Sequence, residues 1–92
     1  MSYFDWNESK NDKLKLERAI CFEDVVVAIN DGRLHDILEH TDPAKYPGQR
    51  FYILEIEDYI YVVPFVKDGE KIFLKTIFPS RKLTKQYLKG DK

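Results

Sequence analysis

Residues 50–78 contain three strand-like segments in close succession, RFYILEIE (50–57), YIYVVPFV (59–66) and KIFLKTIF (71–78). All three are rich in β-branched and aromatic residues, which favour strands. A tight turn near Glu57-Asp58 separates the first two segments. Asp68-Gly69, between the last two, is typical of a hairpin turn that needs positive φ values. Pro64 has no N–H to donate, so we expect a bulge or a local edge there. The segments together predict an antiparallel meander.

The chain before the meander predicts one short strand and two helices. Residues 3–6 alternate in the manner of a short strand, and Asn7 can cap a polar helix that begins at Glu8 and ends near Arg18. A second helix ends at Asn30-Asp31-Gly32. Its apolar stripe has spacings of three and four residues and consists of Phe22, Val25, Val26 and Ile29.

Two further segments flank the meander. Leu34–His40 has no clean alternation and is read as either a strand or an irregular edge, and Thr41–Gln49 is a loop because of its prolines and glycine. After the meander, Ser80 can cap a last helix whose apolar side is Leu83, Tyr87 and Leu88. We therefore expect one α+β domain over residues 1–92, in the order β-α-α-(β)-β-β-β-α. Its small antiparallel sheet of three to five strands would have helices on one face.

Composition excludes some classes of protein. The only cysteine is Cys21, so no disulfide can form within the chain, which fits a reducing compartment. No apolar run approaches the roughly 18 residues that a membrane span needs. The first residues lack the basic and apolar regions of a signal peptide. These features predict a soluble cytoplasmic protein.

Charge is distributed unevenly along the chain. Residues 69–92 hold seven Lys or Arg and two acidic residues, a net of +5, whereas residues 1–30 sum to −2 and residues 31–68 to −4. The formal total of −1 hides this polarity. A basic region of this kind can point to a partner that carries phosphate.

Two sequence patterns, one near each end, carry a family resemblance. The first is Phe4-Asp5-Trp6-Asn7-Glu8 with Lys10-Asn11, leading to Glu17-Arg18-Ala19-Ile20-Cys21-Phe22-Glu23-Asp24. The second is Lys75-Thr76-Ile77-Phe78-Pro79-Ser80-Arg81-Lys82-Leu83-Thr84, followed by Tyr87. In this order they resemble the BrnT family of bacterial type II toxins.

The resemblance implies a RelE-like fold, a ribonuclease that arrests translation, and a cognate antitoxin protein as partner. A homodimer, or a hetero-tetramer with the antitoxin, is the assembly that it suggests. Where the family has Lys-His-Gly between the first two helices, this chain has Glu17-Arg18-Ala19. The role of that histidine therefore passes to Arg18 or is lost.

The basic C-terminal segment supplies the first site candidates. Cleavage of RNA without a metal needs a group that takes the 2′-OH proton, a proton for the leaving oxygen and cations for the charged transition state. Arg81 would lie in the first turn of the last helix and, with Lys82, is our candidate phosphate clamp. The alternative for both is an ordinary basic surface helix.

Four more residues are candidates on weaker grounds. Lys75, on the same strand face as Ile77, would stabilise charge or carry a proton; alternatively it is an edge lysine that blocks aggregation. Lys85 and Arg50 would extend the basic site, although a plain strand-end arginine also explains Arg50. Tyr87 would touch RNA, or simply pack on Leu83.

Histidine changes charge near neutral pH, which makes His35 a candidate catalytic residue. On a regular strand His35 and His40 would face opposite sides, so a mechanism that pairs them needs an irregular segment. Each is otherwise a surface or edge residue. No spacing in the chain suggests a metal site, and no cofactor is predicted.

A second function fits the acidic part of the chain. Here the chain is a toxin-like interaction module without catalytic activity, which binds a protein partner or acts in an operator-binding complex. The acidic residues between 31 and 68 would then be a docking face for a basic antitoxin, or merely solvated surface.

Overall fold

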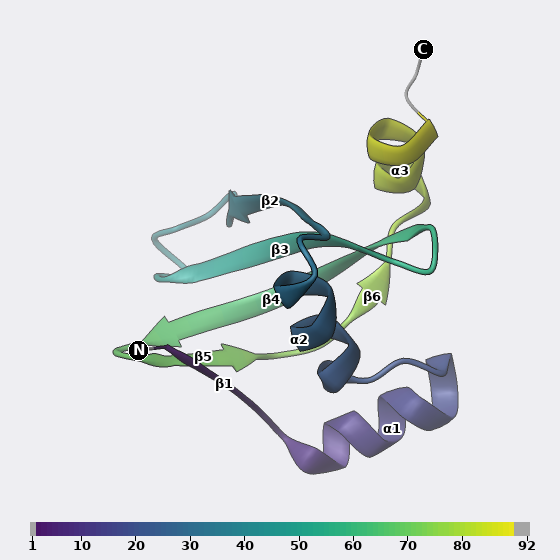
Figure 1. The fold of residues 1–92 in the computed structure, drawn as a ribbon. Coiled ribbons are helices and arrows are strands. Elements are labelled where there is room, and N and C mark those ends of the chain that lie inside the picture. The colour runs from purple at the N-terminus through teal and green to yellow at the C-terminus, as the bar shows by residue number, and fades with distance from the viewer. Residues whose placement is uncertain (1, 90–92) are drawn as a thin grey trace.

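The computed structural model describes residues 2–89, and its helices and strands follow the predicted order closely (Figure 1). The N-terminal half contains β1 (Tyr3–Trp6), α1 (Glu8–Arg18), α2 (Phe22–Asn30) and β2 (Leu34–Glu39). The C-terminal half contains β3 (Gln49–Ile56), β4 (Tyr59–Asp68), β5 (Lys71–Leu74), β6 (Phe78–Pro79), α3 (Arg81–Thr84) and the π-helical turn η1 (Lys85–Lys89). The α+β class is confirmed.

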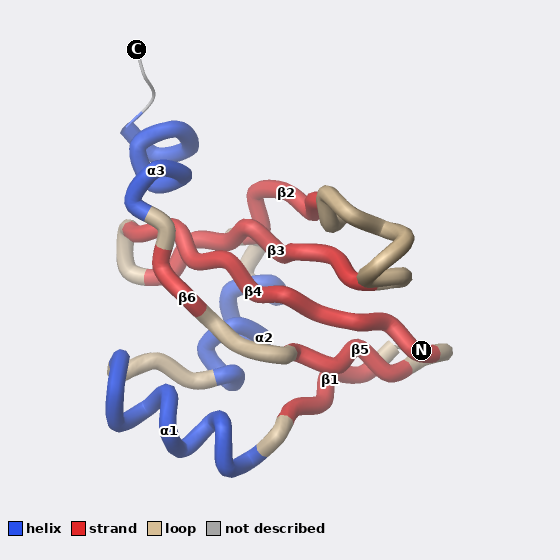
Figure 2. Tube along the Cα trace, turned by 180° about the vertical axis from the view of Figure 1, so that it is seen from behind, coloured by secondary structure: helices blue, strands red, loops and turns tan. Residues whose placement is uncertain are grey.

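The strands form one twisted sheet in the order β1-β5-β4-β3-β2, with β6 paired to β4 beyond the end of β5 (Figure 2). All neighbours are antiparallel except β1, which runs parallel to β5. The expectation of a wholly antiparallel sheet is therefore wrong at this edge. No hairpin constrains the direction of β1, because α1 and α2 carry the chain across the sheet to β2 at the far edge.

Helices cover both faces of the sheet, which corrects the prediction of helices on one face. On one face α1 and α2 pack over the larger core, where Phe22 and Val25 meet Leu54, Val63 and other strand residues. On the other face α3 and η1 cover a second cluster of Ile53, Ile60 and Val62. Both sides of β3 and β4 are apolar, so each side needs its own cover.

The third predicted strand, 71–78, is interrupted after Leu74. Three residues lie between Leu74 and Phe78, but only two lie between their partners on β4, Phe65 and Val62. The extra residue lies opposite Pro64, which accepts a hydrogen bond from Lys75 N at 2.9 Å. The irregularity predicted from Pro64 is thus confirmed. Ile77 turns into the larger core, whereas Lys75 is exposed. The prediction that Lys75 and Ile77 share one strand face is therefore wrong.

One buried and one half-buried tyrosine predict a loss of stability at high pH. Tyr52 is 7% exposed and stacks on Phe65 at 3.9 Å between ring centroids, and burial raises the pKa of its hydroxyl. Burial also raises the pKa of Tyr61, with a further contribution from Glu57. The unfolded chain releases these protons near pH 10, the ordinary value, whereas the folded chain still holds them.

We therefore expect the contribution of these tyrosines to the free energy of unfolding to be complete below about pH 10. It should be lost as pH rises through their folded pKa values. Urea unfolding at pH 8 to 11 measures this loss. In Tyr52→Phe the fall should be shallower. An equal pH dependence in both proteins would assign the loss to other groups.

Candidate functional site

A β-bulge in β2 lies at the centre of the candidate site. Leu34 pairs with Leu54 and Asp36 with Ile53, so His35 is the extra residue between two successive partners on β3. Bulges re-aim side chains and are frequent beside active sites. This bulge leaves both His35 and Asp36 in contact with Tyr87, which packs on the second cluster.

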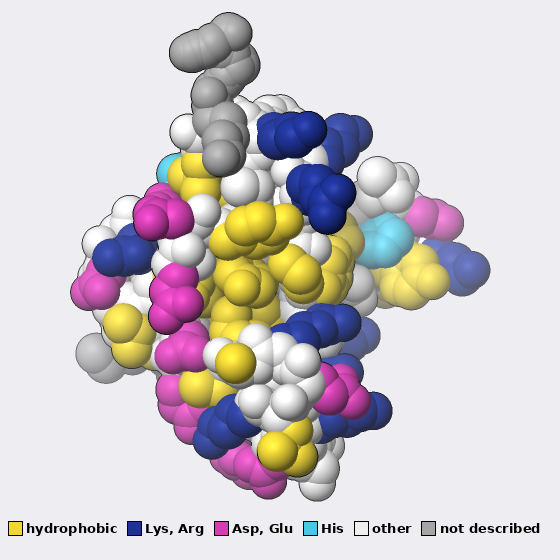
Figure 3. All heavy atoms as spheres, turned by 90° about the vertical axis from the view of Figure 1, so that its right-hand side faces the viewer, with side chains coloured by type: hydrophobic (Ala, Val, Ile, Leu, Met, Phe, Trp, Pro, Cys, Tyr) yellow, Lys and Arg dark blue, Asp and Glu magenta, His cyan; other side chains and the backbone are white. Residues whose placement is uncertain are grey.

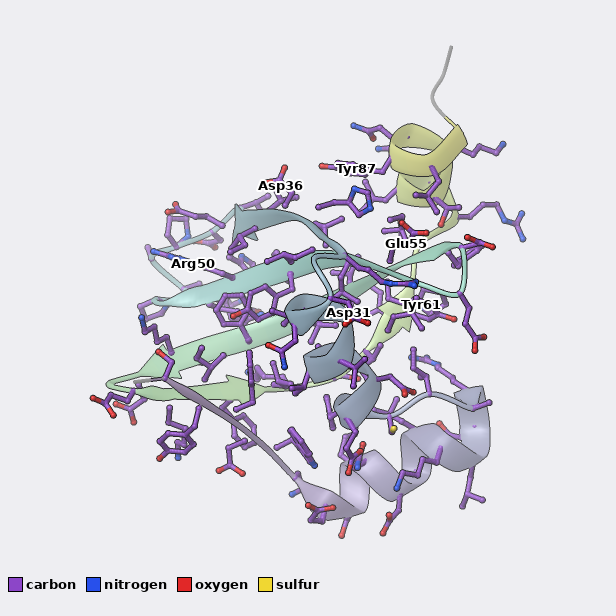
Figure 4. The ribbon with its side chains drawn as sticks, viewed as in Figure 1. Asp31, Asp36, Arg50, Glu55, Tyr61 and Tyr87 are labelled. Carbon is purple, nitrogen blue, oxygen red and sulfur yellow. The ribbon has the colours of Figure 1, made fainter. Side chains whose placement is uncertain are left out.

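Four side chains meet at this point. His35 Nε2 lies 3.2 Å from Glu55 Oε1, and the side chains are 30% and 23% exposed. The His35 and Tyr87 rings are 5.7 Å apart, and the Tyr87 hydroxyl donates to Asp36 Oδ2 at 3.2 Å. Figure 4 shows Tyr87 reaching from the C-terminal helix toward Asp36, with Glu55 on the strand below. We call His35, Asp36, Glu55 and Tyr87 the bulge cluster.

The C-terminal helix positions Tyr87. Ser80 caps α3 by accepting a hydrogen bond from Leu83 N at 3.1 Å, as predicted. Thr84 is buried, and its hydroxyl accepts from Ile60 N at 2.9 Å and donates to Ser80 O at 2.7 Å. These bonds fix the first turn of the helix to β4. The next turn, η1, then holds Tyr87 over β2 and the second cluster.

The environment of Tyr87 keeps it a donor. Burial, followed by the hydrogen bond to Asp36 and the charge of that carboxylate, raises the pKa of the Tyr87 hydroxyl. It therefore stays protonated at neutral pH. His35 has a different chemical role, because a carboxylate that accepts from Nε2–H favours the tautomer in which Nδ1 carries the lone pair. An imidazole held in this way is suited to general base catalysis.

Three candidate cations lie on the helix that carries Tyr87. Arg81, Lys82 and Lys85 are exposed, and within residues 2–89 no carboxylate forms an ion pair with them. Figure 3 shows Lys and Arg side chains on this helix above a broad hydrophobic surface, with further basic side chains below it and acidic ones along the left side. The basic helix and the bulge cluster thus belong to one end of the molecule.

The other cationic candidates lie elsewhere. Lys75 precedes Arg81 by six residues, at most about 20 Å along the chain, and its Nζ contacts Gln49 Oε1 at 3.4 Å. Arg50 lies 4.0 Å from Glu39, at the end of β3 remote from the cluster. Arg18 donates from Nη1 to Ile77 O at 2.5 Å, which ties α1 to the interrupted strand. The Lys75 side chain is thus held toward Gln49 at the start of β3.

Asp36 and Glu55 are the members of the bulge cluster that the sequence did not single out as site residues. Both belong to the acidic segment that predicts solvated surface or a docking face. Their proximity to His35 depends on the pairing of β2 with β3 and on the bulge. To predict this proximity, one would have to know how residues 34–40 pair with the next strand. The segment has no clean alternation of polar and apolar residues from which that pairing could be inferred.

A hollow lies between α2 and the end of β3, and Glu55 of the bulge cluster is among its lining residues. Its volume is about 180 Å³, and the residues around it include Asp24, Asp31, Glu57, Arg33 and Val27. Val27, an apolar residue of α2, is 57% exposed. The hollow therefore combines acidic residues with an exposed apolar side chain.

Comparison with known proteins leaves the site to be interpreted from its own geometry. No family model matches the sequence, and neither the curated proteins nor the solved structures contain a match. Within the described part of the chain, no helix is long and apolar enough to cross a membrane. Among the same residues, no group of three His, Cys, Asp or Glu side chains is arranged to hold a metal ion.

Proposed function

We propose that this chain is an endoribonuclease that inhibits translation, the toxin of a bacterial type II toxin–antitoxin pair. One observation carries the proposal: the His35 imidazole is held by Glu55 at 3.2 Å beside the Tyr87 ring, on the end of the molecule that carries the basic helix. The resemblance of both chain ends to BrnT toxins points in the same direction. A cytoplasmic location, where messenger RNA and ribosomes lie, follows from this proposal.

The reaction uses the RNA 2′-OH as nucleophile. His35 Nδ1 takes the 2′-OH proton, the 2′-oxygen attacks the adjacent phosphorus, and the bond from phosphorus to the 5′-oxygen breaks. The leaving 5′-oxygen takes a proton from water, so the products are a 2′,3′-cyclic phosphate and a 5′-hydroxyl. Glu55 stabilises the imidazolium that forms. Arg81 and Lys82 stabilise the charge on the phosphate oxygens in the transition state.

Arg81→Ala tests the role of the cationic helix. Losing one group that stabilises a transition-state oxyanion typically lowers the rate by about 10²-fold or more. Expression of wild-type protein should arrest growth and degrade RNA, and Arg81→Ala should relieve both. Because Arg81 is exposed, its replacement should leave the thermal unfolding midpoint within a few degrees of wild type.

Lys13→Ala is the matched control, since Lys13 is an exposed cation on α1. It removes the same charge and should remain toxic. Unchanged toxicity in Arg81→Ala would remove Arg81 from the site. Intact growth and RNA during expression of folded wild type without antitoxin would end the ribonuclease proposal.

A second candidate function rests on the acidic hollow beside α2. Its acidic residues and the exposed Val27 suit a basic amphipathic segment of a protein partner. In this reading the chain is a non-catalytic module whose partner is a small basic antitoxin. A negative RNA-cleavage assay together with a stable complex, weakened by Asp31→Lys and by added salt, would favour it.

A further inference from the structure

Three aromatic rings form a stack at the other end of the sheet face that carries the bulge cluster. The His40 and Tyr46 rings lie 4.2 Å apart between centroids, with 29° between their planes. The His40 and Phe51 rings are 5.5 Å apart. Phe51 packs on the second cluster, so the stack continues the hydrophobic surface under the C-terminal helix. Tyr46 is the outer ring and is 39% exposed.

The loop between β2 and β3 is folded so that Tyr46 lies on His40. Asp42 N donates to His40 Nδ1 at 3.0 Å, and Tyr46 N donates to Asp42 O at 3.0 Å. Asp42 Oδ1 accepts from Lys45 N at 3.2 Å. The ring of His40 is therefore fixed by the loop, and Tyr46 is presented by a hydrogen-bonded turn.

One lysine lies over the outer ring of the stack, and a second contacts a neighbouring residue. Lys45 Nζ is 5.6 Å from the centroid of the Tyr46 ring. Lys75 Nζ contacts Gln49, whose carbonyl accepts from His40 N at 3.3 Å. A hollow of about 120 Å³ adjoins the stack, and Glu39 and Arg50, which lie 4.0 Å apart, are among its lining residues.

We propose that the His40–Tyr46 stack is a base-binding subsite for single-stranded RNA, resting on the function proposed above. A partly exposed ring with a lysine ammonium 5.6 Å from its centroid suits a nucleobase with its phosphate, because base–aromatic stacking combined with backbone cations is the usual basis of single-strand binding. The stack lies five residues along β2 from His35, about 15 Å. The bound base therefore lies a few nucleotides away from the cleaved bond.

Binding of an uncleavable probe tests this subsite apart from catalysis. The probe is a 2′-O-methyl RNA octamer that contains one 2-aminopurine, placed in turn at each position, with fluorescence and affinity measured at a fixed low salt concentration. We expect quenching at one position, and at least about fivefold weaker binding by Tyr46→Ala. Tyr46→Trp should keep both the quenching and the affinity of wild type. Tyr3→Ala removes a 55% exposed tyrosine from the far edge of the sheet and should change neither the quenching nor the affinity.

The outcomes separate this inference from the proposed function. Wild-type protein that fails to bind the octamer, or Tyr46→Ala protein that binds it as tightly as wild type, overturns the subsite. So does a Tyr46→Ala protein that loses only the binding of a protein partner. Quenching at one probe position, in a protein that cleaves no RNA, would support the subsite and contradict only the proposed ribonuclease activity.

Discussion

His35→Ala is expected to lower RNA cleavage by about 10²- to 10⁴-fold, the usual contribution of a general base. The variant removes the only imidazole of the bulge cluster and leaves Glu55 and Tyr87 without it. Single-turnover cleavage of a labelled RNA measures the effect. The ratio of the wild-type rate constant to that of His35→Ala, measured in the same buffer, gives the size of the loss.

Glu55→Gln separates positioning from proton transfer. Glutamine can still accept a hydrogen bond from His35 Nε2, but it has no charge to stabilise the imidazolium. Its cleavage rate should fall below that of wild type, but by less than the rate of His35→Ala. Glu57→Gln, the same change in the exposed turn after β3, is the matched control and should retain wild-type cleavage. Equal cleavage rates in wild type, Glu55→Gln and Glu57→Gln would exclude a role for Glu55.

Asn11→Ala is expected to lower the free energy of unfolding by about 3 kcal/mol. Asn11 is fully buried, accepts from Phe22 N at 2.7 Å and donates to Glu23 Oε1 at 2.9 Å. It thereby joins α1 to the first turn of α2. The alanine variant leaves the Phe22 N–H buried without its partner and also leaves a small cavity. Urea unfolding of both proteins measures the difference.

Two further variants sharpen this test. The hydrogen bond from Asn11 is the main cause of a lowered pKa for Glu23, so wild-type stability should fall as pH drops below about 4.5 through the folded pKa. That fall should be smaller in Asn11→Ala. Asn11→Asp places a second carboxylate beside Glu23. The loss of unfolding free energy in this variant, relative to wild type, should therefore become smaller as the pH is lowered. Asn30→Ala, at an exposed position, should change stability by less than about 0.5 kcal/mol.

Local signals predicted most of the secondary structure. Asn7 and Ser80 cap their helices through bonds within three residues, and Asp68-Gly69 closes the hairpin between β4 and β5. Such features depend on short stretches of chain, which a sequence displays directly. The parallel pairing of β1 with β5 and the cover of the second face by α3 and η1 depend on distant segments. The residue pattern within any one short segment does not specify these long-range contacts.

The candidate site shows the same division. His35, Tyr87 and Arg81 were candidates because of their chemistry, and the structure brings the first two into contact. Asp36 and Glu55 were missed because one extra residue in β2 determines what they face. Asn11 was likewise missed, since a polar residue on a polar helix gives no sign that it is buried.

Analysis of the ends of cleaved RNA tests the ribonuclease proposal most directly. Purified wild-type protein and His35→Gln, matched for folded content by their thermal unfolding, are incubated with the same RNA at pH 7. The proposal predicts fragments that end in 2′,3′-cyclic phosphates with wild type, and their loss by at least about 10²-fold with His35→Gln. Equal cleavage by both proteins, or intact RNA with the folded wild type, would contradict it.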